Sequence, residues 1–171
     1  MAQNTKIIVT DIKTPEQRSQ NMAAVKGKDT KPEMIVRKYL FSRGMRFRVQ
    51  VRKLPGTPDI VLPKYKTVIF VNGCFWHGHE GCKYFRLPKS NVEFWKDKIE
   101  RNIERDKESM RALLDQGWKV IRVWECDLRN KANREDTLNK IYNSITTSGN
   151  SGYRLEETDI PMATEPEADY S

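Results

Sequence analysis

The segment that most constrains the fold is the eleven-residue run NGCFWHGHEGC, residues 72–82. It holds both histidines of the 171-residue chain and two of its three cysteines. Cys74, His79 and Cys82 follow the spacing C-x4-H-x2-C, and Cys126 is the only other cysteine. Three thiolates and one imidazole form a ligand set that zinc prefers, and four protein ligands are typical of a structural site. The sequence therefore predicts a structural zinc ion that ties this loop to the region of Cys126.

Alternatives to this ligand set remain open from the residues alone. His77 also has a suitable spacing from Cys74, so either histidine of the segment could bind the metal. If one histidine binds it, the other is the only one left for acid–base chemistry. Without a metal, these residues would be buried thiols and surface histidines. The three glycines in the loop favour the metal, because such a loop holds its shape poorly by packing alone.

The charge of the chain favours a polyanionic partner. The net charge is +8, with 31 basic and 23 acidic residues. Residues 148–171 contain one base and six acids, which leaves 30 basic and 17 acidic residues, a net charge of +13, in residues 1–147. A body this basic points to nucleic acid, although many soluble domains are basic without such a ligand. The odd number of cysteines, with no signal peptide or long apolar run, predicts a cytoplasmic protein without disulfides or a membrane span.

Hydrophobic spacing predicts one α/β domain. Helices are expected at 15–25, 31–43, 90–116 and 132–146, and strands at 46–51, 59–62, 67–71 and 119–124. This order of elements predicts a central mixed sheet flanked by helices. We expect a flexible N-terminal arm at 1–13, the folded domain at 14–147 and a disordered acidic tail at 148–171.

Asp59 is the first catalytic candidate. The dipeptide Pro58-Asp59 opens a predicted strand, and a second apolar strand follows after a short turn. This is the first half of a pattern found in Mg²⁺-dependent nucleases, in which a later acid and lysine complete the site. The second half is absent, because the following strand ends Phe70-Val71-Asn72. Pro-Asp is also an ordinary turn dipeptide, so the pattern alone leaves both interpretations open.

Several segments together resemble the very-short-patch repair (Vsr) family of T:G mismatch endonucleases. They are Asn21-Met22, LPGTPDIV, VIFVNGCFWHGHEGC, EFWKDKI, ERD and GWKVIRVWEC, and the likeness covers about residues 14–128. The resemblance implies a restriction-endonuclease-like core with a structural zinc. It also implies a Mg²⁺-dependent enzyme that nicks one DNA strand 5′ of the T in T:G mismatches, which arise from deaminated 5-methylcytosine.

The resemblance also implies roles for single residues. Asp59 and the backbone carbonyl of Val71 would bind one or two Mg²⁺ ions. His77 would act as general base, and Asp106 would orient its ring. His79 is then the zinc ligand, together with Cys74, Cys82 and Cys126.

Three of the matched positions have alternative interpretations. The best-known family members carry a histidine where this chain has Asn72, which can hydrogen-bond a phosphate or a metal-bound water but carries no positive charge. Glu33 matches a family acid near the active centre, and it also completes a helix capping box that begins at Thr30. Asp106 could equally be one exposed charge on a highly charged helix.

The aromatic residues Phe75, Trp76 and Trp95, with Met22, match family residues that enter DNA beside the mismatch. Wedging costs least where base pairing is already weak, as in a T:G wobble pair. The alternative is that these side chains belong to the core. The expected partners are double-stranded DNA with a T:G mismatch and other mismatch-repair proteins, for a monomer in the bacterial cytoplasm near the nucleoid. The rival functions are a non-catalytic zinc DNA-binding protein and a nuclease of the same fold with a different DNA substrate.

Overall fold

The computed structural model describes residues 14–25 and 27–147, so the expected arm at 1–13 and tail at 148–171 lie outside the described residues. Within this part, four strands form one sheet in the order β1-β2-β3-β4. The strands are β1 (Arg48–Val49), β2 (Ile60–Leu62), β3 (Thr67–Asn72) and β4 (Lys119–Trp124). The first three are antiparallel neighbours and β4 runs parallel to β3, which confirms the predicted mixed sheet.

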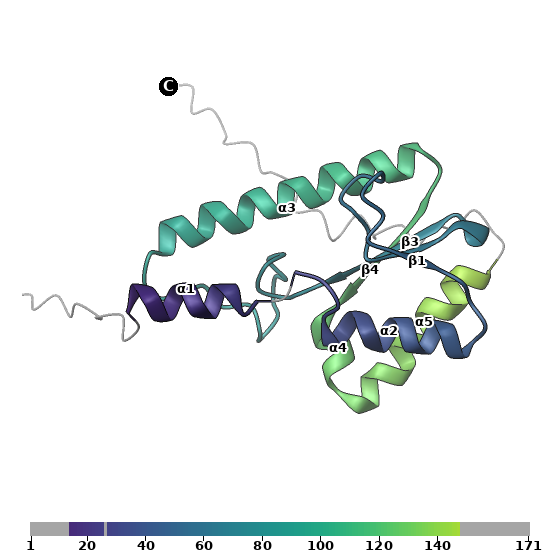
Figure 1. Cartoon of the computed structure of the whole chain (residues 1–171), viewed down its shortest axis with the longest axis horizontal. Helices are drawn as coiled ribbons and strands as arrows, with labels where there is room; N and C mark the ends of the chain where they lie inside the picture. Colours follow the sequence, from purple (N-terminus) through teal and green to yellow (C-terminus); the bar gives the residue numbers. More distant parts are fainter. Residues whose placement is uncertain (1–13, 26, 148–171) are drawn as a thin grey trace, which may run out of the picture.

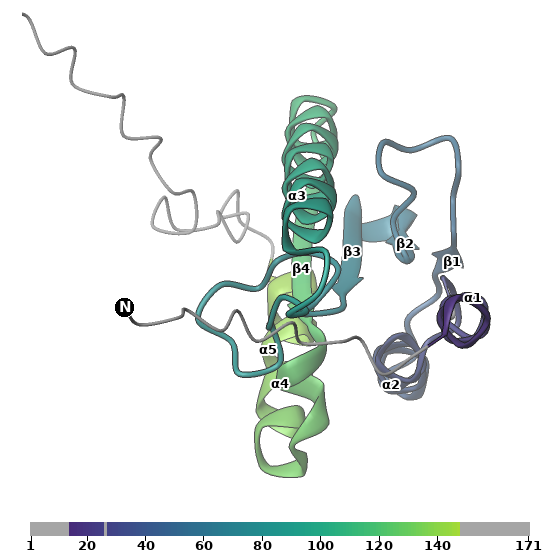
Figure 2. The same cartoon turned by 90° about the vertical axis from the view of Figure 1, so that its left-hand side faces the viewer.

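Helices cover both faces of this sheet (Figures 1 and 2). α3 (Val92–Asp115) lies on one face. The opposite face carries α2 (Lys31–Ser42), α4 (Glu125–Arg129) and α5 (Lys131–Thr146). α1 (Pro15–Ala23) lies apart from these layers, to one side of the molecule in Figure 1. None of the described helices has the length and apolar content needed to cross a membrane.

The alternation of side chains along the strands divides the core into two clusters. Successive side chains of a strand point to opposite faces of the sheet. One cluster packs against α2, α4 and α5 and takes from the sheet Ile60, Leu62, Ile69, Ile121 and Val123. The other packs against α3 and takes from the sheet Val61, Val68 and Val120. β3 is apolar on both faces because both of its faces are covered.

The predicted first strand and the predicted start of the third helix were partly wrong. The strand expected at 46–51 is only two residues long, because Gln50 has a φ of 50°, which ends the extended backbone. The helix expected to begin at residue 90 begins at Val92. The N-cap is Asn91, which has a φ of 52° and makes no side-chain cap hydrogen bond.

The remaining predicted elements agree with the structure to within two residues at each end. The turn expected at 63–66 is a short 3-10 helix, η1 (Pro63–Tyr65). The sequence does not predict α4, because a five-residue helix is too short to show a hydrophobic period. This helix is nevertheless important for the site, since it carries Cys126.

Candidate metal centre and acidic pocket

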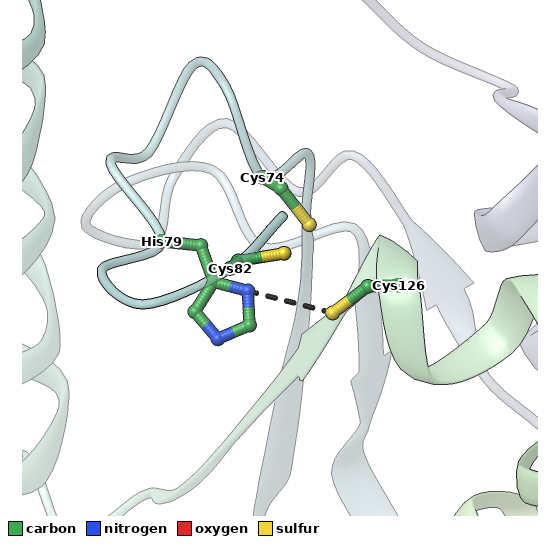
Figure 3. Close-up of side chains that lie close together, drawn as sticks. All are labelled: Cys74, His79, Cys82 and Cys126. Atoms are coloured by element: carbon green, nitrogen blue, oxygen red, sulfur yellow. Dashed lines mark hydrogen bonds between the residues drawn. The ribbon is translucent and has the colours of Figure 1, made fainter. Parts of the chain in front are cut away.

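The parallel pair β3–β4 brings the two halves of the predicted metal site together. Asn72, the last residue of β3, lies opposite Trp124, the last residue of β4. The loop after β3 and the first turn of α4 therefore start side by side. Four ligand atoms converge there, all within 4.8 Å of one another (Figure 3), and they belong to Cys74, His79, Cys82 and Cys126.

The structure distinguishes the two histidines. The Nδ1 atom of His79 lies 3.4 Å from the Sγ atom of Cys126 (Figure 3). Its ring stacks on Trp124 with a centroid distance of 4.0 Å and an interplanar angle of 2°. The indole of Trp124 therefore fixes the plane of this imidazole. His77 is not part of the cluster and faces α3 instead.

The thiols of the cluster differ in environment. Burial raises the pKa of Cys74 and that of Cys126, so both thiols hold their protons strongly without a cation. A backbone hydrogen bond from Tyr84 lowers the pKa of Cys82. A divalent cation deprotonates the thiols that it binds, because the metal–thiolate bond outweighs the cost of burying the charge. Three sulfur atoms and one imidazole nitrogen at this spacing fit a tetrahedral metal ion.

A second feature lies at the same end of the sheet, an open pocket with a volume of about 650 Å³. Its polar lining includes Glu33, Gln50, Asp59, Asn72, His77, Asp106 and Glu125. Among the described residues that line it there is no lysine or arginine. Arg37 and Arg129 pair with Glu33 and Glu125 from outside the lining, whereas Asp59 and Asp106 have no lysine or arginine partner among the ion pairs of the described residues. A divalent cation at these two carboxylates would reduce the repulsion of an anionic ligand.

Asp59 is held at both carboxylate oxygens. The backbone N–H of Val71 donates to Oδ2 at 2.7 Å, and the side-chain amide of Gln50 donates to Oδ1 at 3.2 Å. Burial raises the pKa of Asp59 to about 6, against the two hydrogen bonds, and the charge of Glu33 adds to the increase. The carboxylate is thus oriented but poorly solvated. A bound cation would therefore stabilise its charged form strongly.

The paired part of β2 ends before it reaches Val71 of β3. Ile60 of β2 lies opposite Ile69 of β3, and extending this register by two residues would set Pro58 opposite Val71. Residues in this position of an antiparallel pair exchange two hydrogen bonds, but proline has no N–H to donate. The carbonyl of Val71 and the carboxylate of Asp59 therefore lie on the same side of β3. Oxygen atoms of these two kinds are ligands that Mg²⁺ prefers.

His77 and Asp106 form a second pair on the pocket wall. The Nδ1 atom of His77 lies 2.5 Å from Oδ2 of Asp106, which comes from α3. The loop is fixed to α3 beside this pair, because Asn102 donates to the carbonyl of Trp76 at 3.0 Å. Gly78 makes the close approach possible, since a Cβ atom there would lie 2.6 Å from Cδ1 of Ile103.

Glu33 is both a capping residue and a lining residue of the pocket. Its backbone N–H donates to Oγ1 of Thr30, whose hydroxyl donates back to Oε1 at 2.8 Å. Oε2 accepts from the backbone N–H of Asp29 at 3.0 Å and from the guanidinium of Arg37 at 2.8 Å. The side chain of Arg37 is buried and also pairs with Asp29. These donors stabilise Glu33 as a buried anion at the edge of the pocket.

The four candidate DNA-wedging residues fall into two groups. Phe75, Trp76 and Trp95 form one aromatic cluster, with ring centroids 5.1 to 6.1 Å apart. They are half-buried, and Trp76 also lines the pocket. Met22 on α1 does not join the cluster through these ring contacts, but it lines the same pocket and is 42% exposed. Met22 and Trp76 therefore line the pocket, Phe75 and Trp95 contact Trp76, and all four lie outside the two core clusters.

The fold and the site together define an α/β protein that combines a cluster of three cysteines and one histidine, which could hold a metal ion, with a carboxylate-lined pocket. The chain belongs to the Vsr family: the family model "DNA mismatch endonuclease Vsr" matches residues 10–83, and the relatives below agree.

Three relatives illustrate the similarity. The Type II nicking enzyme V.NmeAIP of Neisseria meningitidis is 49% identical over 137 residues, which cover 80% of this chain and 97% of that enzyme. The Type II nicking enzyme V.XorIIP of Xanthomonas oryzae is 47% identical over 133 residues, or 78% of this chain and 97% of that enzyme. The DNA mismatch endonuclease Vsr of Escherichia coli is 42% identical over 128 residues, or 75% of this chain and 81% of that protein.

Sequence reasoning missed two polar residues of the pocket. Gln50 belongs to no motif, and only the hydrogen bond from its side-chain amide to Asp59 reveals it. Glu125 lies beside Cys126 in the WEC segment, and only Cys126 of this segment has a residue type that predicts a role. Its Oε1 accepts from Arg129 at 2.6 Å, while its Oε2 lies close to Gly73.

Proposed function

We propose that this protein is a Mg²⁺-dependent DNA endonuclease that nicks one strand on the 5′ side of the T in a T:G mismatch. The mismatches arise by deamination of 5-methylcytosine. Relatives named as a mismatch endonuclease and as nicking enzymes support this proposal. The observation that carries it is the pocket, in which Asp59 and the His77–Asp106 pair share one acidic cavity without a lysine or arginine among its described lining residues.

The chemistry follows from the groups that face the pocket. Asp59 and the carbonyl of Val71 would hold Mg²⁺, which would supply positive charge to stabilise the negative charge that develops on the phosphate and on the leaving 3′-oxygen. His77 takes the proton of the attacking water at Nε2, since its Nδ1 is engaged by Asp106. Asp106 keeps the ring oriented and stabilises the imidazolium that forms. Glu33 and Asn72 line the same pocket and complete the polar wall around the phosphate.

We further propose that the thiolate–imidazole centre holds structural zinc. Its ligands Cys74, His79 and Cys82 lie on both sides of His77, so a bound ion restricts the loop that carries the general base. The sheet and helices around it are consistent with a restriction-endonuclease-like core.

Recognition of the mismatch is assigned to the aromatic cluster and to Met22. Phe75, Trp76 and Trp95 offer flat apolar surfaces next to the pocket, and such surfaces can enter a weakened base step. Met22 lies on the pocket from the side of α1. The enzyme acts as a monomer, since one nick requires one active site. Its chromosomal substrate places it in the cytoplasm near the nucleoid, with other mismatch-repair proteins as partners.

A nicking assay tests the proposal. End-labelled duplexes with one T:G or one T:A pair, in several sequence contexts, are incubated with wild-type protein and with Asp59→Ala. Mg²⁺ is omitted rather than chelated in the control, because a chelator would also strip the thiolate centre. Asp136→Ala serves as the matched variant, because Asp136 is an exposed acid on α5 far from the pocket lining.

A single Mg²⁺-dependent cut beside T in the T:G duplex, absent in Asp59→Ala and present in Asp136→Ala, supports the proposal. Tight DNA binding without a cut in any context identifies a non-catalytic DNA-binding protein. Equal cutting of the T:A duplex identifies a nuclease with another substrate.

A further inference from the structure

We propose that Gln50 is a positioning residue of the catalytic centre, whose amide holds the Asp59 carboxylate in the orientation that receives the divalent cation. This inference rests on the proposed function and adds a residue to its machinery. Gln50 does not bind the reacting phosphate in this proposal; it acts through Asp59.

The first support is the register of the sheet. Val49 of β1 lies opposite Ile60 of β2, and Gln50 and Asp59 adjoin this pair just beyond the ends of the two paired strands. Cross-strand neighbours of this kind lie close enough for their side chains to interact. The amide Nε2 of Gln50 is 3.2 Å from Oδ1 of Asp59, and both residues line the pocket.

The second support is the way in which the carboxylate is held. The N–H of Val71 fixes Oδ2 and the amide of Gln50 fixes Oδ1, so rotation of the carboxylate breaks at least one hydrogen bond. A carboxylate accepts but cannot donate, which requires the NH₂ end of Gln50 to face Asp59. The amide oxygen is then left as the acceptor end of the side chain, available to a water in the pocket.

The third support is the neutrality of the amide. A lysine or arginine at position 50 would also hold Asp59, but its charge would compete with a metal ion for the carboxylate. The guanidinium of Arg37, another residue of this region, is engaged by Glu33 and Asp29. Gln50 therefore orients Asp59 without neutralising it, as required of a group that supports a metal ligand.

The backbone of Gln50 gives a further reason to assign a role to its side chain. Its φ of 50° lies in the left-handed region, which glycine adopts more easily than any residue with a Cβ atom. Strained positions of this kind persist where the side chain or the bend has a use, and they are common at active sites. A merely structural bend would be served equally well by glycine.

The test compares two substitutions that separate the side chain from the bend. Gln50→Gly removes the amide and relieves the left-handed strain, whereas Gln50→Leu removes the amide and keeps the strain. Lys66→Gly is the matched control, because Lys66 has a similar φ of 48° and does not line the pocket. Three quantities are measured: the free energy of unfolding in urea without Mg²⁺, the affinity for Mn²⁺ from the electron paramagnetic resonance signal of unbound ion, and the Mg²⁺ concentration for half-maximal nicking.

We expect both Gln50 variants to bind Mn²⁺ about tenfold more weakly and to need about tenfold more Mg²⁺ for nicking. We also expect Gln50→Gly to unfold at an equal or higher urea concentration than wild type. Its weaker metal binding would then not result from a less stable fold. Lys66→Gly should leave both metal measurements unchanged.

The positioning role would be overturned if both Gln50 variants had a Mn²⁺ affinity and a Mg²⁺ requirement within twofold of wild type. It would also be overturned if metal affinity fell only in variants whose free energy of unfolding fell as well. If wild type itself shows no Mg²⁺-dependent nicking, the proposed function fails. The Mn²⁺ affinities then decide the role of Gln50 by themselves: a tenfold loss in both variants supports it, and equal affinities refute it.

Discussion

His77, on the loop after β3, and Asp106, in the middle of α3, lie 29 residues apart in sequence, yet their side chains meet at 2.5 Å. The pair joins the loop that contains the thiolate centre to the helix on the opposite side of the pocket. Since the contact uses Nδ1, the other ring nitrogen is left for proton transfer. The geometry of this pair therefore gives the first test of the catalytic assignment.

Replacing Asp106 with asparagine should slow nicking by about 100-fold or more, with little change in DNA binding. The amide keeps the shape of the carboxylate but cannot stabilise an imidazolium, and it can favour the wrong tautomer of His77. Single-turnover rates with saturating enzyme would measure the effect. Asp115→Asn, at the exposed end of the same helix, should behave as wild type. Equal losses in both variants would indicate a general effect on α3.

Gly78→Ala tests how the loop is seated on α3. The glycine has a φ of 60°, and an added Cβ atom would lie 2.6 Å from Cδ1 of Ile103 and 3.0 Å from Cγ2 of Ile99. We expect a loss of about 2–4 kcal/mol in the free energy of unfolding, from steric overlap and left-handed strain together.

Gly81→Ala is the control for this prediction. Gly81 has a φ of 69° in the same loop, but a Cβ atom there meets nothing within 4 Å. Only the backbone strain remains, so the loss should be about 1 kcal/mol. Urea unfolding of the two variants, compared side by side, measures the difference. Equal destabilisation would mean that the contact between Gly78 and α3 carries no energetic weight.

Pro58→Ala tests whether the carbonyl of Val71 is a metal ligand. An alanine offers an N–H at the position opposite Val71, where it can extend the ladder and occupy this carbonyl. The Mg²⁺ concentration for half-maximal nicking should then rise several-fold while Asp59 is intact. Pro55→Ala, in the turn just before, should have no such effect. An unchanged Mg²⁺ requirement in Pro58→Ala would argue against Val71 as a ligand.

Asp59→Asn should stabilise the protein without added Mg²⁺ at neutral pH. Burial raises the pKa of Asp59 from 3.8 to about 6, so the native state holds its proton more tightly than the unfolded state does. Between these two pH values the stability of wild type falls as the pH rises, and the full cost is present above pH 6. A shift of this size corresponds to at most about 3 kcal/mol. The variant lacks this charge and avoids the cost.

Urea unfolding of wild type and Asp59→Asn at a series of pH values measures this difference. The advantage of the variant should be largest above pH 6 and should disappear near pH 4, where the wild-type carboxyl is protonated. An advantage that stays constant with pH would show that ionisation of Asp59 is not its cause.

The sequence predicted most of the elements because their signals are local. The apolar run Thr67–Val71 marks a strand covered on both faces, and the pair Thr14 and Gln17 forms the capping box that starts α1. The predicted start of α3 at residue 90 was two residues early, because Asn91 adopts a left-handed conformation and the helix begins only after it. Local patterns describe what a segment can do, and tertiary contacts decide whether it does so.

The candidate site was predictable where its reactive side chains lie close together in the sequence. It was not predictable where strand pairing brings distant side chains together. The clustering of Cys74, His79 and Cys82 is visible in the sequence, and the structure brings Cys126 to them. The hydrogen bond from Gln50 to Asp59 depends on how β1 and β2 align, and the place of Pro58 beside Val71 depends on how β2 and β3 align. Register depends on packing and on turn geometry over many residues, so a single sequence does not specify it.

The two histidines provide the last test, because the structure places them in two different groups of side chains. His79 lies in the thiol cluster and stacks on Trp124, whereas His77 contacts Asp106. His79→Ala should therefore lose most of the bound zinc, measured by elemental analysis after dialysis, and should unfold at a lower urea concentration. His77→Ala should retain one zinc per chain and near-wild-type stability while its nicking rate falls by about 100-fold or more. Zinc loss in His77→Ala, with retention in His79→Ala, would reverse the two assignments.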